Sequence, residues 1–254
     1  MPHGHSWFSF LPFYEDLYRL ANNGRQTWIA HSALGIQHVL AFVFVLLLLV
    51  LCGLAVKRRF SDVQASILPS DRLTIPTTFE IITSTSYAMI ADIFGDRHAA
   101  RYFLPLIGAC AFVILVSNAL GLVPGFAPPT DNLNTTFAMA IIIFIATHVY
   151  GIKKHGVVKY AKHFMGPFLP LAVLMVPIEL ISHIARPVTL AIRLMANMTA
   201  DHLVLGIFLG LVPFVVPLPM YVLGCIVVLV QTLVFCLLSA VYIALAIEDH
   251  GDGH

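Results

Sequence analysis

The sequence predicts an all-α integral membrane protein with about five membrane helices and one amphipathic surface helix, the last two membrane helices being long and steeply tilted. Of its 254 residues, 59% are hydrophobic and 11% are charged, whereas about a quarter are charged in soluble domains. The mean hydropathy is +0.90. Several apolar runs reach the roughly 20 residues that an α-helix needs to cross a bilayer. We expect one membrane domain over 1–254.

The first span is predicted over residues 35–56, and Lys57, Arg58 and Arg59 follow it directly. Cytoplasmic loops of membrane proteins carry an excess of lysine and arginine. This end of the span is therefore expected to face the cytoplasm, which places the N-terminal segment 1–34 outside. That segment lacks a basic stretch followed by an apolar stretch and a small-residue cleavage site, so no signal peptide is predicted.

Residues 57–101 are predicted to form a cytoplasmic and interfacial segment. Its second part reads TTFEIITSTSYAMIADIFGDRHAARY. Apolar residues recur there at spacings of 3, 4 and 7, while Glu80, Asp92 and Asp96 supply a polar side. This pattern predicts an amphipathic helix that lies on the cytoplasmic surface.

The second and third spans are predicted within residues 102–152. They run from about Tyr102 to Val123 and from about Thr135 to Ile152, and the Pro- and Gly-rich segment PGFAPPTDNLN between them predicts an outer loop. The third span ends in KKHGVVKYAKH, whose four lysines place this loop inside. Both basic loops therefore predict the same orientation.

Residues 167–247 are almost continuously apolar, interrupted by ionisable groups and prolines. Two helices averaging near 40 residues would each measure about 60 Å at 1.5 Å per residue, so they would have to tilt steeply or lie partly flat. They would return the C-terminus to the cytoplasm. Three or four conventional spans are the alternative on hydropathy alone.

A polar stripe is predicted on one helix face within this region. At 100° per residue, six residues share a sector about 80° wide. They are Glu179, His183, Arg186, Arg193, Asn197 and Asp201. His202 points elsewhere, and Pro187 can kink the helix and rotate its two halves apart. The plainer interpretation is that the stripe lines a bundle interior, with Glu179 paired to Arg186 or to His183.

Arg193 is the most informative residue of this stripe. A guanidinium stays charged at all accessible pH, and its burial near the middle of a bilayer costs about 2.5 to 3.5 kcal/mol or more. Such a cation repels protons and lowers the pKa of a nearby acid, which suits a gate better than a relay. Glu179 and His183 are titratable and could pass protons along.

Other polar residues of the apolar regions are less specific. Gln231 and Tyr242 are 11 residues apart, hence about 20° apart on a helix, which suggests one hydrogen-bonding face opposite the stripe. A buried glutamine is equally often a satisfied amide. His148 lies close to the cytoplasmic lysines and is interpreted as interfacial rather than as part of a relay, and His38 is similarly ambiguous.

The run PIELISHIARPVTLAIRLMANMTADHLVL, followed by VLVQTLVFCLLSAVYIALAIEDH, resembles subunit a of the bacterial F-type ATP synthases. The segments SNALGLVPGF, PTDNLNTTFAMA and YGIKKHG resemble the same family in the same order. The resemblance covers most of the chain from about residue 75 onward, and its Arg-Leu-x-x-Asn-Met core is specific. It implies a non-catalytic stator beside a rotating ring of small proteolipid c subunits, each with a membrane-buried carboxylate. Two aqueous half-channels would meet that ring at offset positions.

The resemblance assigns roles residue by residue. It implies that Arg193 keeps the half-channels apart and holds the passing ring carboxylate ionised. Asn197 and Gln231 match polar neighbours of that arginine, and Glu179 matches the acid on the cytoplasmic exit path.

The inlet path departs from the family pattern. His202 falls where many members have a glutamate. The family also often has a histidine or glutamate seven residues before the glutamine, and that position is Gly224 here. The inlet is therefore left to His202 alone, or to Asp201 with it.

The resemblance also implies peripheral-stalk b subunits and, indirectly, the catalytic ATPase sector as partners in a bacterial inner membrane. No GxxxxGK[ST] loop is present, so neither an enzymatic nucleotide site nor any cofactor, metal or nucleic-acid site is predicted. Protons are favoured over sodium because histidine titrates near neutral pH. The alternatives are a polytopic secondary transporter or an ion channel, although no inverted repeat of the transporter kind is visible.

Overall fold

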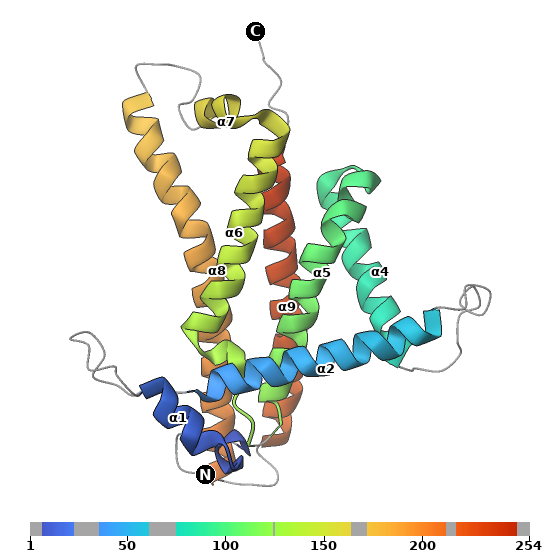
Figure 1. Ribbon diagram of the computed structural model, residues 1–254, viewed down its shortest axis with the longest axis vertical. Coiled ribbons are helices and arrows are strands. Elements are labelled where there is room, and N and C mark those ends of the chain that lie inside the picture. The colour runs from blue at the N-terminus through green and yellow to red at the C-terminus, as the bar shows by residue number, and fades with distance from the viewer. Residues whose placement is uncertain are drawn as a thin grey trace. The chain divides into compact units, whose positions relative to one another are not determined.

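The computed structural model describes residues 7–22, 36–60, 75–123, 125–163, 172–211 and 217–247, and every regular element among them is a helix (Figure 1). Five of these helices are long and apolar enough to cross a membrane: Gln37–Lys57, Arg97–Gly121, Leu133–His155, Met175–Gly210 and Pro217–Ile247. The prediction of an all-α chain with about five membrane helices is therefore confirmed.

The elements follow one another in a simple order along the chain. They are η1 (Trp7–Phe10), α1 (Tyr14–Asn22), α2 (Gln37–Phe60), α4 (Ile75–Phe94), α5 (Arg97–Gly121), η2 (Pro129–Asp131), α6 (Leu133–His155), α7 (Val157–His163), α8 (Ala172–Leu211) and α9 (Pro217–Ile247). The expected cytoplasmic C-terminus and parts of the predicted segments 1–34 and 57–101 lie outside the described residues.

The last apolar region forms two helices, as predicted, and not three or four. α8 has 40 residues and α9 has 31 residues, which correspond to about 60 Å and about 45 Å of helix. α8 contains Pro177 and Pro187. Just after Pro187, the Thr189 hydroxyl donates to the carbonyl oxygens of Ala185 and Arg186 at 2.8 and 3.0 Å, a kind of local bond that bends helices.

The predicted amphipathic helix is α4, and it ends at Phe94, before the end of the segment that was predicted to contain it. Gly95 has φ of 63°, a left-handed conformation that terminates helices. Asp96 then accepts the backbone N–H groups of His98 at 2.9 Å and Ala99 at 3.3 Å, so it caps the first turn of α5. These two hydrogen bonds hold the pKa of the Asp96 carboxyl below its ordinary value. A tight turn therefore separates α4 from α5.

The described residues group into two compact units. Unit 1 draws on Met1–Thr78, Phe112–Thr135 and Met195–Val230, and unit 2 on Phe79–Ala111, Thr136–Leu194 and Gln231–His254. In unit 2, α4, α5 and α9 share a buried cluster: Ile90, Ala100, Phe103, Ile107, Ala111, Cys236, Ala240 and Ile243. In unit 1, Phe8 is buried and its ring centroid lies 5.8 Å from that of Phe44 and 5.4 Å from that of Phe126.

Candidate functional site

Arg193 lies on an exposed face of α8. The side chains of Ile192 and Asn197 are exposed on the same helix, whereas Leu190 and Leu194 are only 3% and 0% exposed. Within the described part of the chain, no carboxylate pairs with the Arg193 guanidinium. Because this cation sits in an apolar span and cannot deprotonate, it requires water or a negative group from outside the chain.

The residues of the predicted stripe do not share one environment. His183 is buried at 8% exposure, Glu179 and Asp201 are half-buried, and Arg193 is exposed. Glu179 and His183 belong to unit 2 and Asp201 belongs to unit 1. Arg193 therefore stands between two separate sets of titratable groups along the same helix.

The first set surrounds His183 in unit 2. The His183 Nδ1 atom lies 3.0 Å from the Glu179 carbonyl oxygen and 3.2 Å from the Glu179 carboxylate oxygen Oε1. The sequence predicted either Arg186 or His183 as the partner of Glu179. The structure shows the pair of Glu179 and His183, which are one helical turn apart. The bond to the backbone indicates that Nδ1 carries a proton, which leaves Nε2 as the exchangeable position.

His148 on α6 also belongs to this set. Its ring centroid lies 5.6 Å from that of His183, and its Nδ1 atom lies 2.9 Å from the Phe144 carbonyl oxygen. The sequence interpretation of His148 as interfacial missed this contact. Ile143 and Thr147 are buried on the same helix, and no pattern in the sequence of α6 indicated that His148 would meet a residue of α8.

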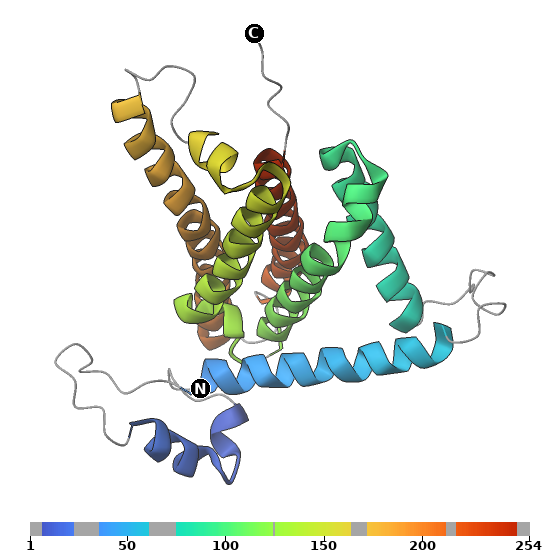
Figure 2. The same cartoon turned by 45° about the horizontal axis from the view of Figure 1, so that its top comes forward.

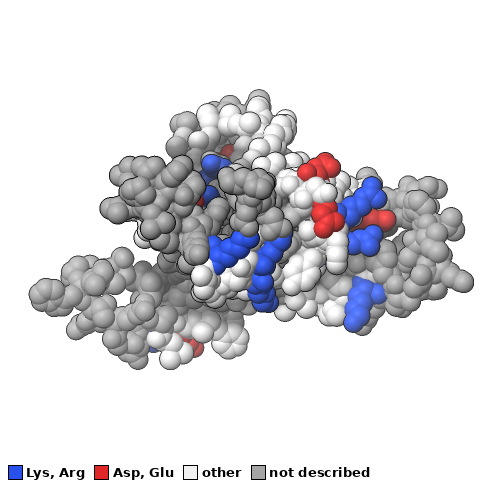
Figure 3. Space-filling model, turned by 90° about the horizontal axis from the view of Figure 1, so that it is seen from above, with Lys and Arg blue, Asp and Glu red and all other residues white. Residues whose placement is uncertain are grey.

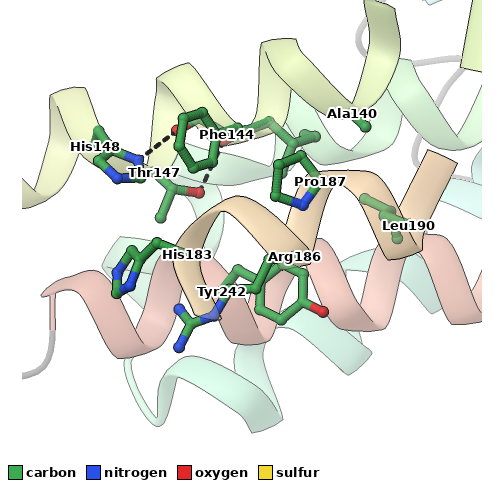
Figure 4. A pocket seen from close by; sticks show the side chains of 10 residues that line it. Ala140, Phe144, Thr147, His148, His183, Arg186, Pro187, Leu190 and Tyr242 are labelled. Atoms are coloured by element: carbon green, nitrogen blue, oxygen red, sulfur yellow. Dashed lines mark hydrogen bonds between the residues drawn. The ribbon is translucent and has the colours of Figure 1, made fainter. Parts of the chain in front are cut away.

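His148, His183, Arg186 and Tyr242 line a small pocket in unit 2 (Figure 4), and Glu179 contacts His183 from outside this lining. Its volume is about 10 Å³, which is room for about one water molecule. The Arg186 guanidinium carbon lies 5.4 Å from the centroid of the Tyr242 ring on α9, a cation–π distance. We call this set the His183 cluster: Glu179, His183, His148, Arg186 and Tyr242.

Gln231 and Tyr242, predicted on one face of α9, both belong to unit 2. Gln231 is buried at 4% exposure, and Tyr242 is half-buried against Arg186. The structure therefore joins Tyr242 to the His183 cluster. Burial raises the pKa of the nearby Tyr160 hydroxyl on α7, and the charge of Arg186 lowers it.

The second set lies around Asp201 in unit 1. Its packing explains why a residue without a side chain fits at position 224. A Cβ atom added at Gly224 would lie 3.1 Å from the Asp201 carboxylate oxygen Oδ2 and 2.8 Å from Cδ2 of Leu122. The 2.8 Å contact would force the Leu122 side chain to move, and the 3.1 Å contact is tight enough that the Asp201 carboxylate would have to shift by a few tenths of an ångström. The carboxylate from α8 thus occupies the space that a larger residue on α9 would need.

The sequence did not single out two residues of this set, Asp131 and Asn118, and Asp131 is the titratable one of the two. Burial raises the pKa of its carboxyl, while the charges of His202 and His38 lower it. Its carbonyl oxygen accepts a hydrogen bond from the Thr199 hydroxyl at 3.3 Å. The sequence showed Asp131 only as an acid in the polar outer loop. The residues that interact with it lie far away in the sequence, on α2 and α8.

Two side chains complete the second set. The His202 Nδ1 and Asn118 Nδ2 atoms are buried, and neither has a hydrogen-bond partner within the described residues. The Asn118 oxygen Oδ1 accepts a hydrogen bond from the Thr130 hydroxyl at 2.6 Å. His38 Nδ1 lies 3.5 Å from Asn132 Nδ2. We call this set the Asp201 cluster: Asp201, His202, Asp131, His38 and Asn118.

Fold and side chains together define a multi-pass helical membrane protein with ionisable groups at membrane depth, and such groups mark ion or proton paths. A family model described as "ATP synthase A chain" matches residues 38–244. This range contains both clusters and Arg193. The chain therefore belongs to the ATP synthase A chain family, the non-catalytic membrane subunit a of ATP synthase.

Several bacterial proteins named ATP synthase subunit a are similar to this chain. The protein of Sorangium cellulosum is 45% identical over 235 residues, which cover 91% of each chain. The protein of Bdellovibrio bacteriovorus is 41% identical over 199 residues, covering 78% of this chain and 86% of the relative. That of Trichlorobacter lovleyi is 51% identical over 170 residues, covering 67% and 73%.

Proposed function

We propose that Arg193 separates two proton paths, so that protons cross the membrane only on the carboxylate of a partner subunit. The observation that carries this proposal is the exposed Arg193 without a carboxylate partner among the described residues. In the sequence of α8, Glu179 comes 14 residues before Arg193 and Asp201 comes eight residues after it. We assign each cluster to one of the two proton paths.

The counter-group of Arg193 is then a carboxylate on a neighbouring subunit. An opposite charge within about 4 to 6 Å lowers the pKa of an acid by roughly one to three units. Arg193 would keep the partner's carboxylate ionised while it passes and would repel a free proton. The ring of proteolipid c subunits is the partner that fits this chemistry, and the b subunits and the catalytic sector complete the complex.

We assign the Asp201 cluster to the proton inlet. Asp201 and His202 lie on α8 beyond Arg193, and Asp131 and His38 add titratable groups from η2 and α2. Buried polar atoms that lack a protein partner are sites where water binds, which suits a hydrated path. The family often has a larger, titratable residue at the position of Gly224. In this chain we assign its role in the inlet to Asp201.

We assign the His183 cluster to the proton exit. Glu179 carries the carboxylate, whose oxygen Oε1 lies 3.2 Å from His183 Nδ1, and the His148 ring follows at 5.6 Å from the His183 ring. Asn197 and Gln231 are assigned as polar neighbours of Arg193. Histidines that titrate near neutral pH favour protons over sodium as the transported ion.

The orientation follows from the basic side chains of unit 2. Lys153 and Lys154 end α6, Lys159 lies on α7 and Arg97 begins α5, and Figure 3 shows lysine and arginine side chains gathered on one face. Lys154 Nζ also donates to the Ile247 carbonyl oxygen at 2.7 Å, at the end of α9. By the positive-inside tendency, this end and the C-terminus face the cytoplasm and the N-terminus lies outside the bacterial plasma membrane.

The decisive test replaces Arg193 in the assembled complex. Arg193→Ala should abolish ATP synthesis driven by an imposed proton gradient in vesicles and should let protons leak passively. Arg193→Lys should fail as well, because lysine loses the delocalised fork and can deprotonate when desolvated. Arg101→Ala, an exposed arginine on α5, is the matched control and should synthesise ATP normally. Coupled synthesis near the wild-type rate in Arg193→Ala would refute the proposal.

A further inference from the structure

The segment formed by η1 and α1 has a strongly apolar exposed side. Large apolar side chains there are 40% to 73% exposed: Trp7, Phe10, Phe13, Leu17 and Leu20. On α1, Leu17 and Leu20 lie 60° apart at 100° per residue, whereas Glu15 and Arg19 fall on the opposite side and Asp16 lies at the edge, 40° from Leu20. Glu15 and Arg19 lie 3.9 Å apart, and both are exposed.

The segment is fixed to unit 1 rather than loosely attached. The Trp7 backbone N–H donates to the Gly125 carbonyl oxygen at 2.9 Å. Phe8 is 8% exposed and packs between Phe44 of α2 and Phe126 of the loop after α5. The side chain of one aromatic residue is thus held inside the unit while its apolar neighbours remain uncovered.

A hydrogen bond sets the level of α1 relative to the first membrane span. Gln37 Nε2 donates to the Tyr14 hydroxyl at 3.3 Å, and Gln37 is the first residue of the apolar span Gln37–Lys57. Figure 2 shows α1 beside this N-terminal end of α2. Since the start of an apolar span lies at the polar boundary of the bilayer, Tyr14 lies at that boundary too.

Composition points to lipid as the occupant of the apolar side. Trp and Tyr prefer the membrane–water interface, and amphipathic helices bury their apolar side about 5 to 10 Å into the boundary between headgroups and acyl chains. Phe44 lies two turns into the span, about 10 Å beyond Gln37, so Phe8 reaches a similar depth. Two acids and one arginine give α1 a net charge of −1, which does not favour anionic lipid.

We propose that η1 and α1 form an interfacial anchor, whose exposed apolar side inserts into the leaflet at the N-terminal end of α2. The occupant is the lipid bilayer itself, and the attraction is apolar rather than electrostatic. The lipid that surrounds α2 would also cover this apolar surface, so no partner protein is needed there. The anchor would hold the start of the first span at a fixed depth.

Site-directed spin labelling of the reconstituted complex tests the anchor. In a complex without other cysteines, including Cys52, Cys110, Cys225 and Cys236 of this chain, single labels are placed at Leu17, Leu20, Glu15 and Arg19. Vesicles contain phosphatidylcholine, and collisions are measured with lipid-soluble oxygen and a water-soluble nickel chelate. Labels at Leu17 and Leu20 should favour oxygen about fivefold or more over labels at Glu15 and Arg19.

Three outcomes would overturn the anchor. Equal access of the nickel chelate to all four positions would place α1 in water. Protection of Leu17 and Leu20 from both reagents would show a covering protein, such as a stalk subunit. A pattern that appears only after about a third of the lipid is phosphatidylglycerol would show electrostatic attraction instead.

A second variant separates insertion from folding. Leu17→Glu with Leu20→Glu should raise the access of the nickel chelate to a label at position 16, which lies 40° from Leu20, up to the high value expected at Arg19. The Phe8 contacts should keep η1 in place. Unchanged access at position 16 would contradict insertion. These results do not depend on Arg193. The label pattern can fail while ATP synthesis continues, which would refute only the anchor. Normal ATP synthesis in Arg193→Ala would refute only the proposed proton paths.

Discussion

The His183 cluster and the Asp201 cluster are both built on α8, yet their side chains are held in different ways. His183 bonds the Glu179 carbonyl oxygen and His148 bonds the Phe144 carbonyl oxygen, each four residues back on its own helix. The Asp201 cluster instead assembles groups from α2, α5, η2 and α8 beside a glycine of α9. Local bonds orient the first cluster, and packing between distant segments orients the second.

This difference predicts how the two proton paths respond to substitution. A histidine fixed within one helical turn keeps its geometry as long as the helix forms. The Asp201 carboxylate lies so close to Gly224 that a Cβ atom added there would force it to shift by a few tenths of an ångström. Substitutions should therefore damage the Asp201 cluster more severely than the His183 cluster, and the following expectations can break or refine that comparison.

The largest effect is expected from Gly224→Leu. Even a Cβ atom at this position would lie 3.1 Å from the Asp201 carboxylate, so the larger side chain should displace it. Proton-driven ATP synthesis in vesicles should fall about tenfold or more, since a positioned acid–base group contributes at least that much. Gly224→Ala should cost less, because the flexible Leu122 side chain can move away.

Gly53→Leu is the matched control, because no atom lies within 4 Å of a Cβ added there. Asp201→Asn should reproduce the loss if the carboxylate itself is the target. A Gly224→Leu complex that is assembled and fully active would show that Asp201 is not positioned by this space.

A smaller effect is expected from Glu179→Gln in the His183 cluster. The position needs a titratable carboxylate, but water in the path can partly replace it, so proton exit should slow by about three- to tenfold and not by the roughly hundredfold or more of an irreplaceable acid–base group. Glu179→Asp should retain much of the activity. His148→Leu should give a milder deficit, because His183 keeps its own bond to the backbone. Glu80→Gln, an exposed glutamate on α4, serves as control. Equal rates for Glu179→Gln and wild type would remove Glu179 from the path.

His202→Glu is expected to change the pH dependence more than the maximal rate. The ordinary pKa of histidine is near 6.5 and that of glutamate near 4.3, so the outside-pH optimum for synthesis should move down by up to about two units. His98→Glu, at an exposed histidine, should leave the profile unchanged. An identical profile in His202→Glu and His202→Ala would assign the inlet to Asp201 or water.

The smallest effect is expected from Asp131→Asn. Burial raises the pKa of this carboxyl, so the folded state binds its proton more tightly than the unfolded state and the wild type loses stability as pH rises through the raised pKa. The variant lacks that loss. Its thermal midpoint at pH 7 should therefore exceed the wild-type value by about 2 °C, with no gain below the unfolded pKa near 3.9.

Asp92→Asn, at an exposed acid of α4, should not change the midpoint of the detergent-solubilised complex. If Asp131 also passes protons, Asp131→Asn should slow synthesis slightly at the same time. A variant that is less stable than the wild type at pH 7 would show that Asp131 is stabilised as the anion in the folded protein.

The sequence by itself determined the features that depend on local interactions. Apolar run length fixes where membrane-length helices form, whereas over 167–247 hydropathy alone left both two long helices and three or four conventional spans open. The contact between Glu179 and His183 follows from a spacing of four residues on a helix. Arg193 was recognisable because a permanent charge within an apolar run is costly wherever the helix lies.

Only the tertiary structure decided which distant residues meet. His148 reaches His183 because α6 packs against α8, and Asp201 faces Gly224 because α9 leaves that space open. Asp131 lies 71 residues before His202 (202 − 131), so no helical period connects them. Side-chain periodicity reports one element at a time, whereas the contacts that assemble these clusters depend on how several helices pack, which no local pattern encodes.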